Sequence, residues 1–170
     1  MIVGIGGVST SGKTTLASRL KVALPSKSLL VICQDDYINH INDIPKIKSR
    51  VDWEHPLSIN QNTFHEAILS GTDKAEIVIA EGLMIFQNHV ISSLFTRRIF
   101  IDLNYATFKE RKKADNRWGS EPDWYVEHIW NSYLTYGLPE KSMKDILRID
   151  GAKSYDITQI INYLYHGKLD

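Results

Sequence analysis

Five short runs of apolar residues alternate along the chain with segments of helical periodicity. The runs are Ile2–Ile5, Leu29–Cys33, Ile77–Ala80, Ile99–Leu103 and Ile146–Ile149. Hydrophobicity within each run is continuous rather than alternating, which is typical of strands covered on both faces in a parallel sheet. The pattern predicts a doubly wound α/β fold: a five-stranded parallel sheet, helices on both faces, and ligands at the carboxyl ends of the strands.

Polar residues mark where helices between these runs are expected to begin. The side chains predicted to cap helix N-termini are Ser58, Asn104, Ser120 and Ser154. Ser58 with Gln61, and Ser120 with Asp123, have the spacing of a capping box. Gly71 is expected to end the helix that Ser58 begins, because glycine readily adopts the left-handed conformation that terminates helices.

A complete Gly-x-x-x-x-Gly-Lys-[Ser/Thr] motif at residues 7–14 joins the first run to the first helix. Its glycines let successive N–H groups surround phosphate oxygens, and the helix adds the positive end of its dipole. Lys13 is expected to reach the β- and γ-phosphates, and the Thr14 hydroxyl to ligate Mg²⁺. A glycine-rich turn could match by chance, but the strand–loop–helix context is the one the motif requires. The predicted ATP-binding residues of this loop are Gly7, Ser9, Ser11, Gly12, Lys13, Thr14 and Thr15.

Carboxylates follow the second and third runs, at the sheet edge where the phosphates are expected. Asp35 and Asp36 follow the second run, and we favour Asp35 as the base that accepts a proton from an attacking hydroxyl. The alternative is that this pair only turns or caps the chain. Glu81 ends the third run, where a Walker-B-type carboxylate would hold Mg²⁺ through water; alternatively, it caps the next segment.

A basic segment at about residues 109–122 is predicted to form a lid. Arg111 and Arg117 are candidates to clamp triphosphate oxygens, because a guanidinium presents several donors and stays charged. A closing segment would also exclude water from the reaction. The alternative is a basic face that is merely solvated.

A polar segment at residues 38–57 is the candidate acceptor site. Asp52 could bind sugar hydroxyls, and Trp53 could stack on a flat base. An ordinary loop is equally compatible with these residues, and His55 could simply fix the turn that follows it.

Composition narrows the class of partner. The 170 residues are expected to form one domain (1–170), and 20 basic and 20 acidic residues give a formal charge of zero. This balance argues against a nucleic-acid or anionic-membrane partner, and no apolar stretch reaches the roughly 18 residues of a membrane span. The N-terminus has no signal-peptide pattern. The single cysteine, Cys33, fits a reducing cytoplasm and a buried position.

Together these motifs resemble the small nucleoside kinases of the uridine kinase-like group, most closely the nicotinamide riboside kinases. The resemblance covers nearly the whole chain, and its most specific elements are Gln34-Asp-Asp-Tyr37 and Asp150-Gly-Ala-Lys-Ser154. Further matches are the phosphate loop, Glu81–Phe86, Lys109–Arg117, and His128–Trp130 with Tyr133. The resemblance implies the P-loop NTPase fold with a short lid.

The resemblance also implies roles for single residues. Asp35 would be both catalytic base and metal ligand, Asp52 would bind the ribose hydroxyls, and Arg111 would lie in the lid over ATP. Asp150 and Ala152 would lie near the adenine. The residues then assigned to catalysis are Lys13, Asp35 and Arg111; to the acceptor, Asp35, Asp36, Tyr37, Asp52, Trp53 and Lys112; and to the metal, Thr14, Asp35 and Glu81.

The chain departs from the nicotinamide riboside kinase pattern at three places. Val51 stands where an aromatic residue commonly precedes the ribose-binding acid, and Trp53 follows that acid instead. Lys112 replaces a second lid arginine and cannot reproduce its bidentate grip. The sequence Asp-Trp-Glu-His-Pro at residues 52–56 is more similar to uridine kinases. However, residues 71–75 are too few for the hairpin with which those enzymes recognise the base.

The sequence therefore predicts an ATP-dependent, Mg²⁺-requiring kinase that phosphorylates the ribose 5′-hydroxyl of a small nucleoside, nicotinamide riboside first. The alternatives are a kinase of uridine, cytidine or another small hydroxyl compound, and a nucleotide-responsive binding module. Acids at two strand ends and a basic segment favour chemistry over a switch. The expected protein is a cytoplasmic monomer or small homo-oligomer.

Overall fold

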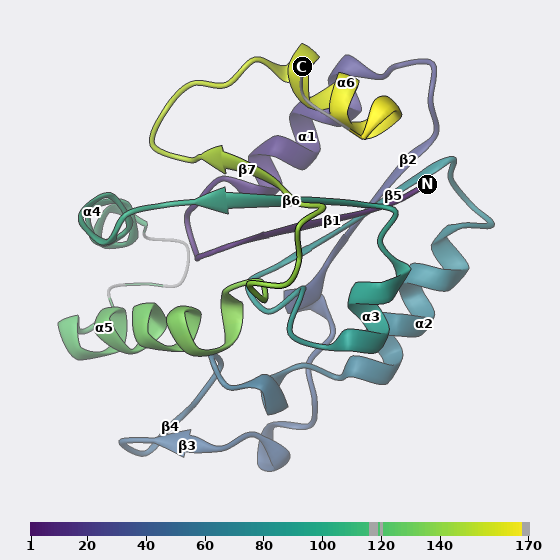
Figure 1. Cartoon of the computed structure of the whole chain (residues 1–170). Helices are drawn as coiled ribbons and strands as arrows, with labels where there is room; N and C mark the ends of the chain where they lie inside the picture. The colour runs from purple at the N-terminus through teal and green to yellow at the C-terminus, as the bar shows by residue number, and fades with distance from the viewer. Residues whose placement is uncertain (116–118, 120, 168–170) are drawn as a thin grey trace.

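The computed structural model describes residues 1–115, 119 and 121–167. Its centre is a five-stranded, all-parallel sheet in the order β2-β5-β1-β6-β7 (Figure 1). The strands are β1 Ile2–Gly7, β2 Leu29–Cys33, β5 Ile77–Gly82, β6 Arg97–Asp102 and β7 Leu147–Asp150. The predicted sheet is confirmed, with strand bounds that differ from the apolar runs by at most two residues at either end.

Helices cover both faces of this sheet, as the continuous hydrophobicity of the strands requires. One face carries α1 (Lys13–Ala23) and α6 (Ile157–His166), which pack on alternate strand residues such as Ile5 and Ile79. The other face carries α2 (Gln61–Gly71), α3 (His89–Leu94), α4 (Tyr105–Ala114) and α5 (Asp123–Ser132) (Figure 1). Strand residues of opposite parity, such as Val78 and Phe100, enter that second core. The inner strand β5 therefore buries both of its side-chain rows, whereas Arg148 and Asp150 of the edge strand β7 are exposed.

Two of the predicted helix caps are wrong. Asn60, not Ser58, caps α2 by accepting a hydrogen bond from Thr63 N at 3.1 Å, because residues 56–58 form a separate 3-10 turn. Asp156, not Ser154, caps α6. At both places, the side chain that accepts the capping hydrogen bond lies two residues further along the chain than predicted.

The other two caps have different outcomes. Asn104 caps α4 as predicted, through a 2.9 Å hydrogen bond from Thr107 N. Ser120 lies outside the described residues, and Pro122 stands at the N-cap of α5.

Between β2 and α2 the chain forms the predicted acceptor segment. It contains a 3-10 turn at Gln34–Asp36 and a small antiparallel hairpin of β3 (Lys46–Ile47) and β4 (Arg50–Val51). α5 packs on this hairpin, with Lys48 Nζ 4.5 Å from the Trp124 ring centroid and the Arg50 guanidinium carbon 5.9 Å from that of Tyr125. Figure 1 shows the hairpin beneath α5, on the side of the molecule where the strands end.

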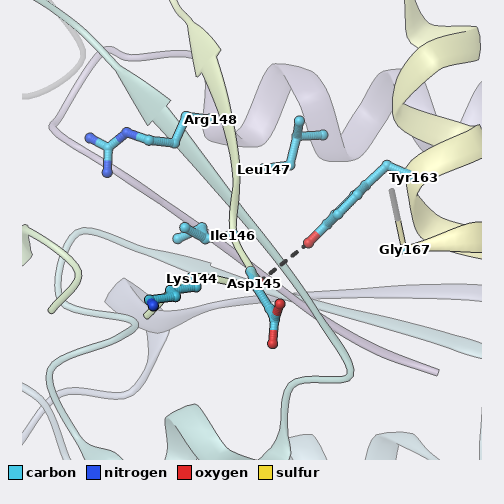
Figure 2. A pocket seen from close by; sticks show the side chains of 7 residues that line it. All are labelled: Lys144, Asp145, Ile146, Leu147, Arg148, Tyr163 and Gly167. Carbon is cyan, nitrogen blue, oxygen red and sulfur yellow. Dashed lines mark hydrogen bonds between the residues drawn. The ribbon is translucent and has the colours of Figure 1, made fainter. Parts of the chain in front are cut away.

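A shallow surface pocket of about 370 Å³ lies at the amino end of β7 (Figure 2). Leu147, the first residue of that strand, lines it, and the Tyr163 hydroxyl points across it toward the Asp145 backbone. This pocket faces away from the carboxyl edge, where Asp150 ends the strand.

None of the helices in the described part of the chain is long and apolar enough to span a membrane.

Candidate active site

The loop between β1 and α1 forms a cradle of backbone N–H groups. Gly7 and Gly12 have φ angles of +153° and +106°, which favour glycine over residues with a Cβ. A Cβ added at Gly12 would meet no heavy atom within 4 Å, whereas one at Gly7 would lie 2.6 Å from Ser11 Oγ. The buried Ser11 hydroxyl has no hydrogen-bond partner among the residues that the structure describes. Open space at Gly12, at the start of α1 and beside this buried hydroxyl, fits a phosphate group.

The side chain of Lys13 turns back over the loop, and the side chain of Thr14 reaches the neighbouring strand β5. Lys13 Nζ donates to Val8 O at 3.1 Å, so its ammonium folds back over the loop. The Thr14 hydroxyl donates to Glu81 Oε1 at 2.5 Å. Glu81 is buried on β5, beside Ile5 of β1. A hydroxyl and a carboxylate in contact beside a phosphate cradle suit Mg²⁺, which prefers oxygen ligands and keeps several waters.

The metal site is nevertheless incomplete in the protein alone. Among residues 1–115, 119 and 121–167, no group of three or more His, Cys, Asp or Glu side chains is arranged to hold an ion. Mg²⁺ in kinases commonly takes its remaining ligands from nucleotide phosphates and water. Thr14 and Glu81 therefore fit a metal that arrives with a nucleotide.

Asp35 lies in the 3-10 turn directly after β2, exposed to solvent. The turn is anchored by Gln34, whose buried Oε1 accepts from Met84 N at 3.1 Å. Cys33 pairs with Glu81 in the β2–β5 register. Burial, with the charges of Glu81 and Asp35, raises the pKa of the Cys33 thiol to about 12. Asp35 therefore follows β2 at the same sheet edge as Glu81.

Asp52 lies buried in the acceptor segment and makes two contacts through one oxygen. His128 Nε2 is 2.7 Å from Asp52 Oδ1, and Glu54 N donates to the same oxygen at 3.1 Å. Trp53, between them in sequence, is 43% exposed. An apolar ring at the surface beside a buried carboxylate is an arrangement that can bind a planar base joined to a sugar.

The pKa of Glu54 reflects several charged side chains around it. Its half-buried carboxyl has its pKa raised to about 7, first by burial and then by the charge of Asp35, with smaller effects from Glu121 and Asp52. Lys112 acts in the opposite direction. Lys112 is itself buried and pairs with Glu121 at 3.1 Å. We call Asp35, Asp52, Glu54, Lys112, Glu121 and His128 the acceptor cluster.

Arg111 of α4 joins the phosphate loop to the end of β7. Its guanidinium donates to Thr10 O at 3.3 Å and to Gly151 O at 2.9 Å. A Cβ on Gly151 would lie 3.0 Å from Ser11 O, so the two loops touch. Asp150 Oδ1 accepts from Ala152 N at 3.0 Å and shapes this second loop.

Some predicted residues lie apart from these contacts. The Tyr37 ring packs on Phe64 with a centroid distance of 5.4 Å, and Asp36 is exposed. Arg117 lies outside the described residues. His55 Nδ1 accepts from Leu57 N at 3.1 Å and so fixes the turn at Pro56, which was one of the two alternatives for this residue.

Sequence reasoning gave no role to Glu54, Glu121 or His128. Each acquires its place only through contacts between segments that are distant in sequence. The only available signal was that His128 lies in a stretch resembling the nicotinamide riboside kinases.

Comparisons with known proteins agree with this geometry. The chain is 30% identical over 175 residues to nicotinamide riboside kinase 1 of Rattus norvegicus, covering 90% of this chain and 87% of that protein. It is 26% identical over 180 residues to the uridine kinase of Borreliella burgdorferi strain B31, covering 88% and 86%. The crystal structure of shikimate kinase from Aquifex aeolicus shares the fold, with a TM-score of 0.54, 19% identity, and 97% and 96% of the two chains covered.

No protein-family model matches the chain. The matches cover most of the length of two proteins named as kinases, and a kinase structure shares the fold. The chain is therefore a kinase that belongs to the nicotinamide riboside kinase-like branch of the uridine kinase-like P-loop nucleoside kinases.

Proposed function

We propose that this enzyme transfers the γ-phosphoryl group of ATP to the ribose 5′-hydroxyl of a small nucleoside, with nicotinamide riboside as the first choice. The observation that carries the proposal is that Asp35 follows β2 directly, at the sheet edge where Cys33 pairs with Glu81. The charge of Asp35 acts on Cys33, beside the phosphate-loop partner Glu81, and on Glu54 of the acceptor cluster. A carboxylate that borders both halves is where a base for phosphoryl transfer is needed.

Each step of the reaction has a residue assigned to it. Asp35 accepts the proton of the 5′-hydroxyl as its oxygen forms a bond to the γ-phosphorus, while the bond from that phosphorus to the β–γ bridging oxygen breaks and ADP leaves. Lys13 and Arg111 neutralise charge on the transferred group. Asp52 holds the ribose hydroxyls. A bound Mg²⁺, held by Thr14, Glu81 and Asp35, would neutralise phosphate charge in the same place.

Charge favours nicotinamide riboside over uridine as the acceptor. The nicotinamide ring of this nucleoside is a cationic pyridinium, whereas uracil is neutral. Against the carboxyl groups of Asp35, Asp52, Glu54 and Glu121, the acceptor cluster offers only the ammonium of Lys112 and the ring of His128. A cationic base is attracted by this excess of acid, and the exposed ring of Trp53 offers it a flat cation–π partner.

The short connection between α2 and β5 also supports nicotinamide riboside over uridine as the acceptor. α2 ends at Gly71 and β5 begins at Ile77, with no strand between them. The base-reading hairpin expected of uridine kinases therefore has no counterpart at this position. A uridine or cytidine kinase remains the second candidate, because the Borreliella uridine kinase is similar along most of both chains.

A panel assay distinguishes the candidates. Purified enzyme with ATP and Mg²⁺ is given nicotinamide riboside, uridine, cytidine, shikimate or no acceptor, and ADP release is measured. We expect the highest kcat/KM with nicotinamide riboside. Activity confined to pyrimidine nucleosides would overturn the choice of acceptor, and ATP binding without transfer to any acceptor would favour a binding module.

The single cysteine, un-ionised near neutral pH, suits the reducing cytoplasm that we propose as the compartment.

A further inference from the structure

The side chain of Asp52 is held by one of its two oxygens. Oδ1 lies 2.7 Å from His128 Nε2 and 3.1 Å from Glu54 N. Because a carboxylate at neutral pH only accepts hydrogen bonds, the ring nitrogen of His128 is the donor. Within residues 1–115, 119 and 121–167, Oδ2 has no hydrogen-bond partner. His128 therefore fixes the carboxylate by one oxygen and leaves the other for a ligand.

His128 is well placed to act as a fixed support. Its side chain is 18% exposed, and its ring lies 5.7 Å from that of Tyr125, one turn earlier on α5. α5 is attached on its other side to α4, through ion pairs of 2.8 Å from Lys109 to Glu127 and 2.9 Å from Lys113 to Asp123. The donor thus belongs to a helix packed between α4 and the hairpin, whereas Asp52 belongs to an irregular segment.

We infer that His128 is a positioning residue for the acceptor, which orients Asp52 so that the free oxygen meets the ribose 2′- and 3′-hydroxyls. The inference rests on the proposed function, because it needs a ribose in the acceptor site. Without the donor, the carboxylate can turn about the Cβ–Cγ bond, so the plane of its two oxygens is no longer fixed and the ribose contact weakens. Selection of ribonucleosides over deoxynucleosides then depends on His128, although His128 touches no part of the sugar.

Three variants separate positioning from general structural damage. His128→Phe keeps the ring beside Tyr125 and removes the donor, whereas His128→Gln keeps a donor at similar reach. His89→Phe is the matched control, because His89 forms an exposed pair with Glu140 at 3.3 Å, away from the acceptor cluster. Each variant is assayed with nicotinamide riboside, uridine and 2′-deoxyuridine at saturating ATP, and the KM for ATP is measured separately.

For His128→Phe, the KM for the ribonucleosides should rise about tenfold, the order expected for losing a hydrogen bond to a charged group. The preference for uridine over 2′-deoxyuridine should fall by a similar factor, and Asp52→Asn should show the same fall. The KM for ATP should stay within about twofold. His128→Gln and His89→Phe should keep the wild-type preference.

Unchanged ribose preference in a folded His128→Phe variant would overturn the inference. An equal loss on ATP and on every nucleoside would also overturn it, since a purely structural role predicts that result. If His128→Phe does not fold, His128→Asn replaces it, because its shorter side chain withdraws the donor. Failure of the wild-type enzyme on all nucleosides would instead refute the proposed function, and this inference with it.

Discussion

The two halves of the candidate site are built differently. On the nucleotide side, the cradle is made by consecutive backbone groups of residues 7–14, with Arg111 contacting main-chain oxygens of Thr10 and Gly151. On the acceptor side, the acceptor cluster is made of side chains from the segment after β2, from α4, from the residues after it, and from α5. A contiguous backbone motif can bind ATP in the same way in kinases that act on different acceptors. A cluster of side chains from several elements can be substituted residue by residue, and the acceptor that it binds changes with it.

The largest effect should come from removing the carboxylate between the two halves. Asp35→Ala is expected to lower kcat roughly 100-fold or more, as for loss of a general base, while the affinity for ATP stays nearly unchanged. Steady-state kinetics and a direct ATP-binding titration measure both quantities. Asp43→Ala, an exposed acid on the same segment, is the control. Near-normal turnover of the Asp35 variant would remove Asp35 from the mechanism.

The acceptor side should also be the pH-sensitive half. Because the pKa of Glu54 is raised to about 7 from its usual value near 4.5, folded protein keeps a proton that the unfolded chain loses between these values. The free energy of unfolding should therefore fall as pH rises through this window.

Glu54→Gln cannot titrate and tests this dependence. Its stability relative to wild type should increase from pH 5 to pH 8 by on the order of 2 kcal/mol. Urea denaturation without nucleotide or Mg²⁺ at both pH values measures the change. An equal stability difference at pH 5 and pH 8 would show that Glu54 does not carry the raised pKa.

The nucleotide side should respond selectively to Arg111. Arg111→Ala removes donors to two loops and is expected to raise the KM for ATP about tenfold. Arg111→Lys should recover little, because one ammonium cannot reproduce a forked contact. The preference among nucleosides should stay as in wild type. A variant whose acceptor preference changes while its KM for ATP does not would reverse the assignment of the two halves.

The smallest effect concerns the helix that follows the acceptor segment. Asn60→Ala should lower the free energy of unfolding by about 1 kcal/mol, through loss of the cap on Thr63 N. Ser58→Ala serves as the comparison, since the buried Ser58 hydroxyl has no hydrogen-bond partner in the described part of the chain. Thermal or chemical denaturation gives both values, and a larger loss for Ser58→Ala would restore the capping box first predicted there.

The difference between the halves also explains what the sequence could predict. The sheet, the phosphate loop and Glu81 at the end of β5 follow local patterns, because strand hydrophobicity and glycine spacing act over a few residues. The residues alone left Asp52 equally compatible with an ordinary loop, and its expected role came from the resemblance. The ion pair of Lys112 with Glu121, and the contact of His128 with Asp52, join residues 9 and 76 positions apart. Such contacts depend on how α4 and α5 pack, and no local spacing encodes that.

In the proposed reaction, a phosphoryl group passes from ATP to a ribose 5′-hydroxyl beside Asp35. Phosphorus-31 NMR of one reaction containing ATP, Mg²⁺ and nicotinamide riboside measures ADP and the 5′-phosphate monoester together. The account predicts that both appear in equal amounts, and that neither forms above background with Asp35→Ala. ADP released without the monoester, or an equally fast reaction with the 5′-deoxy nucleoside, would contradict it.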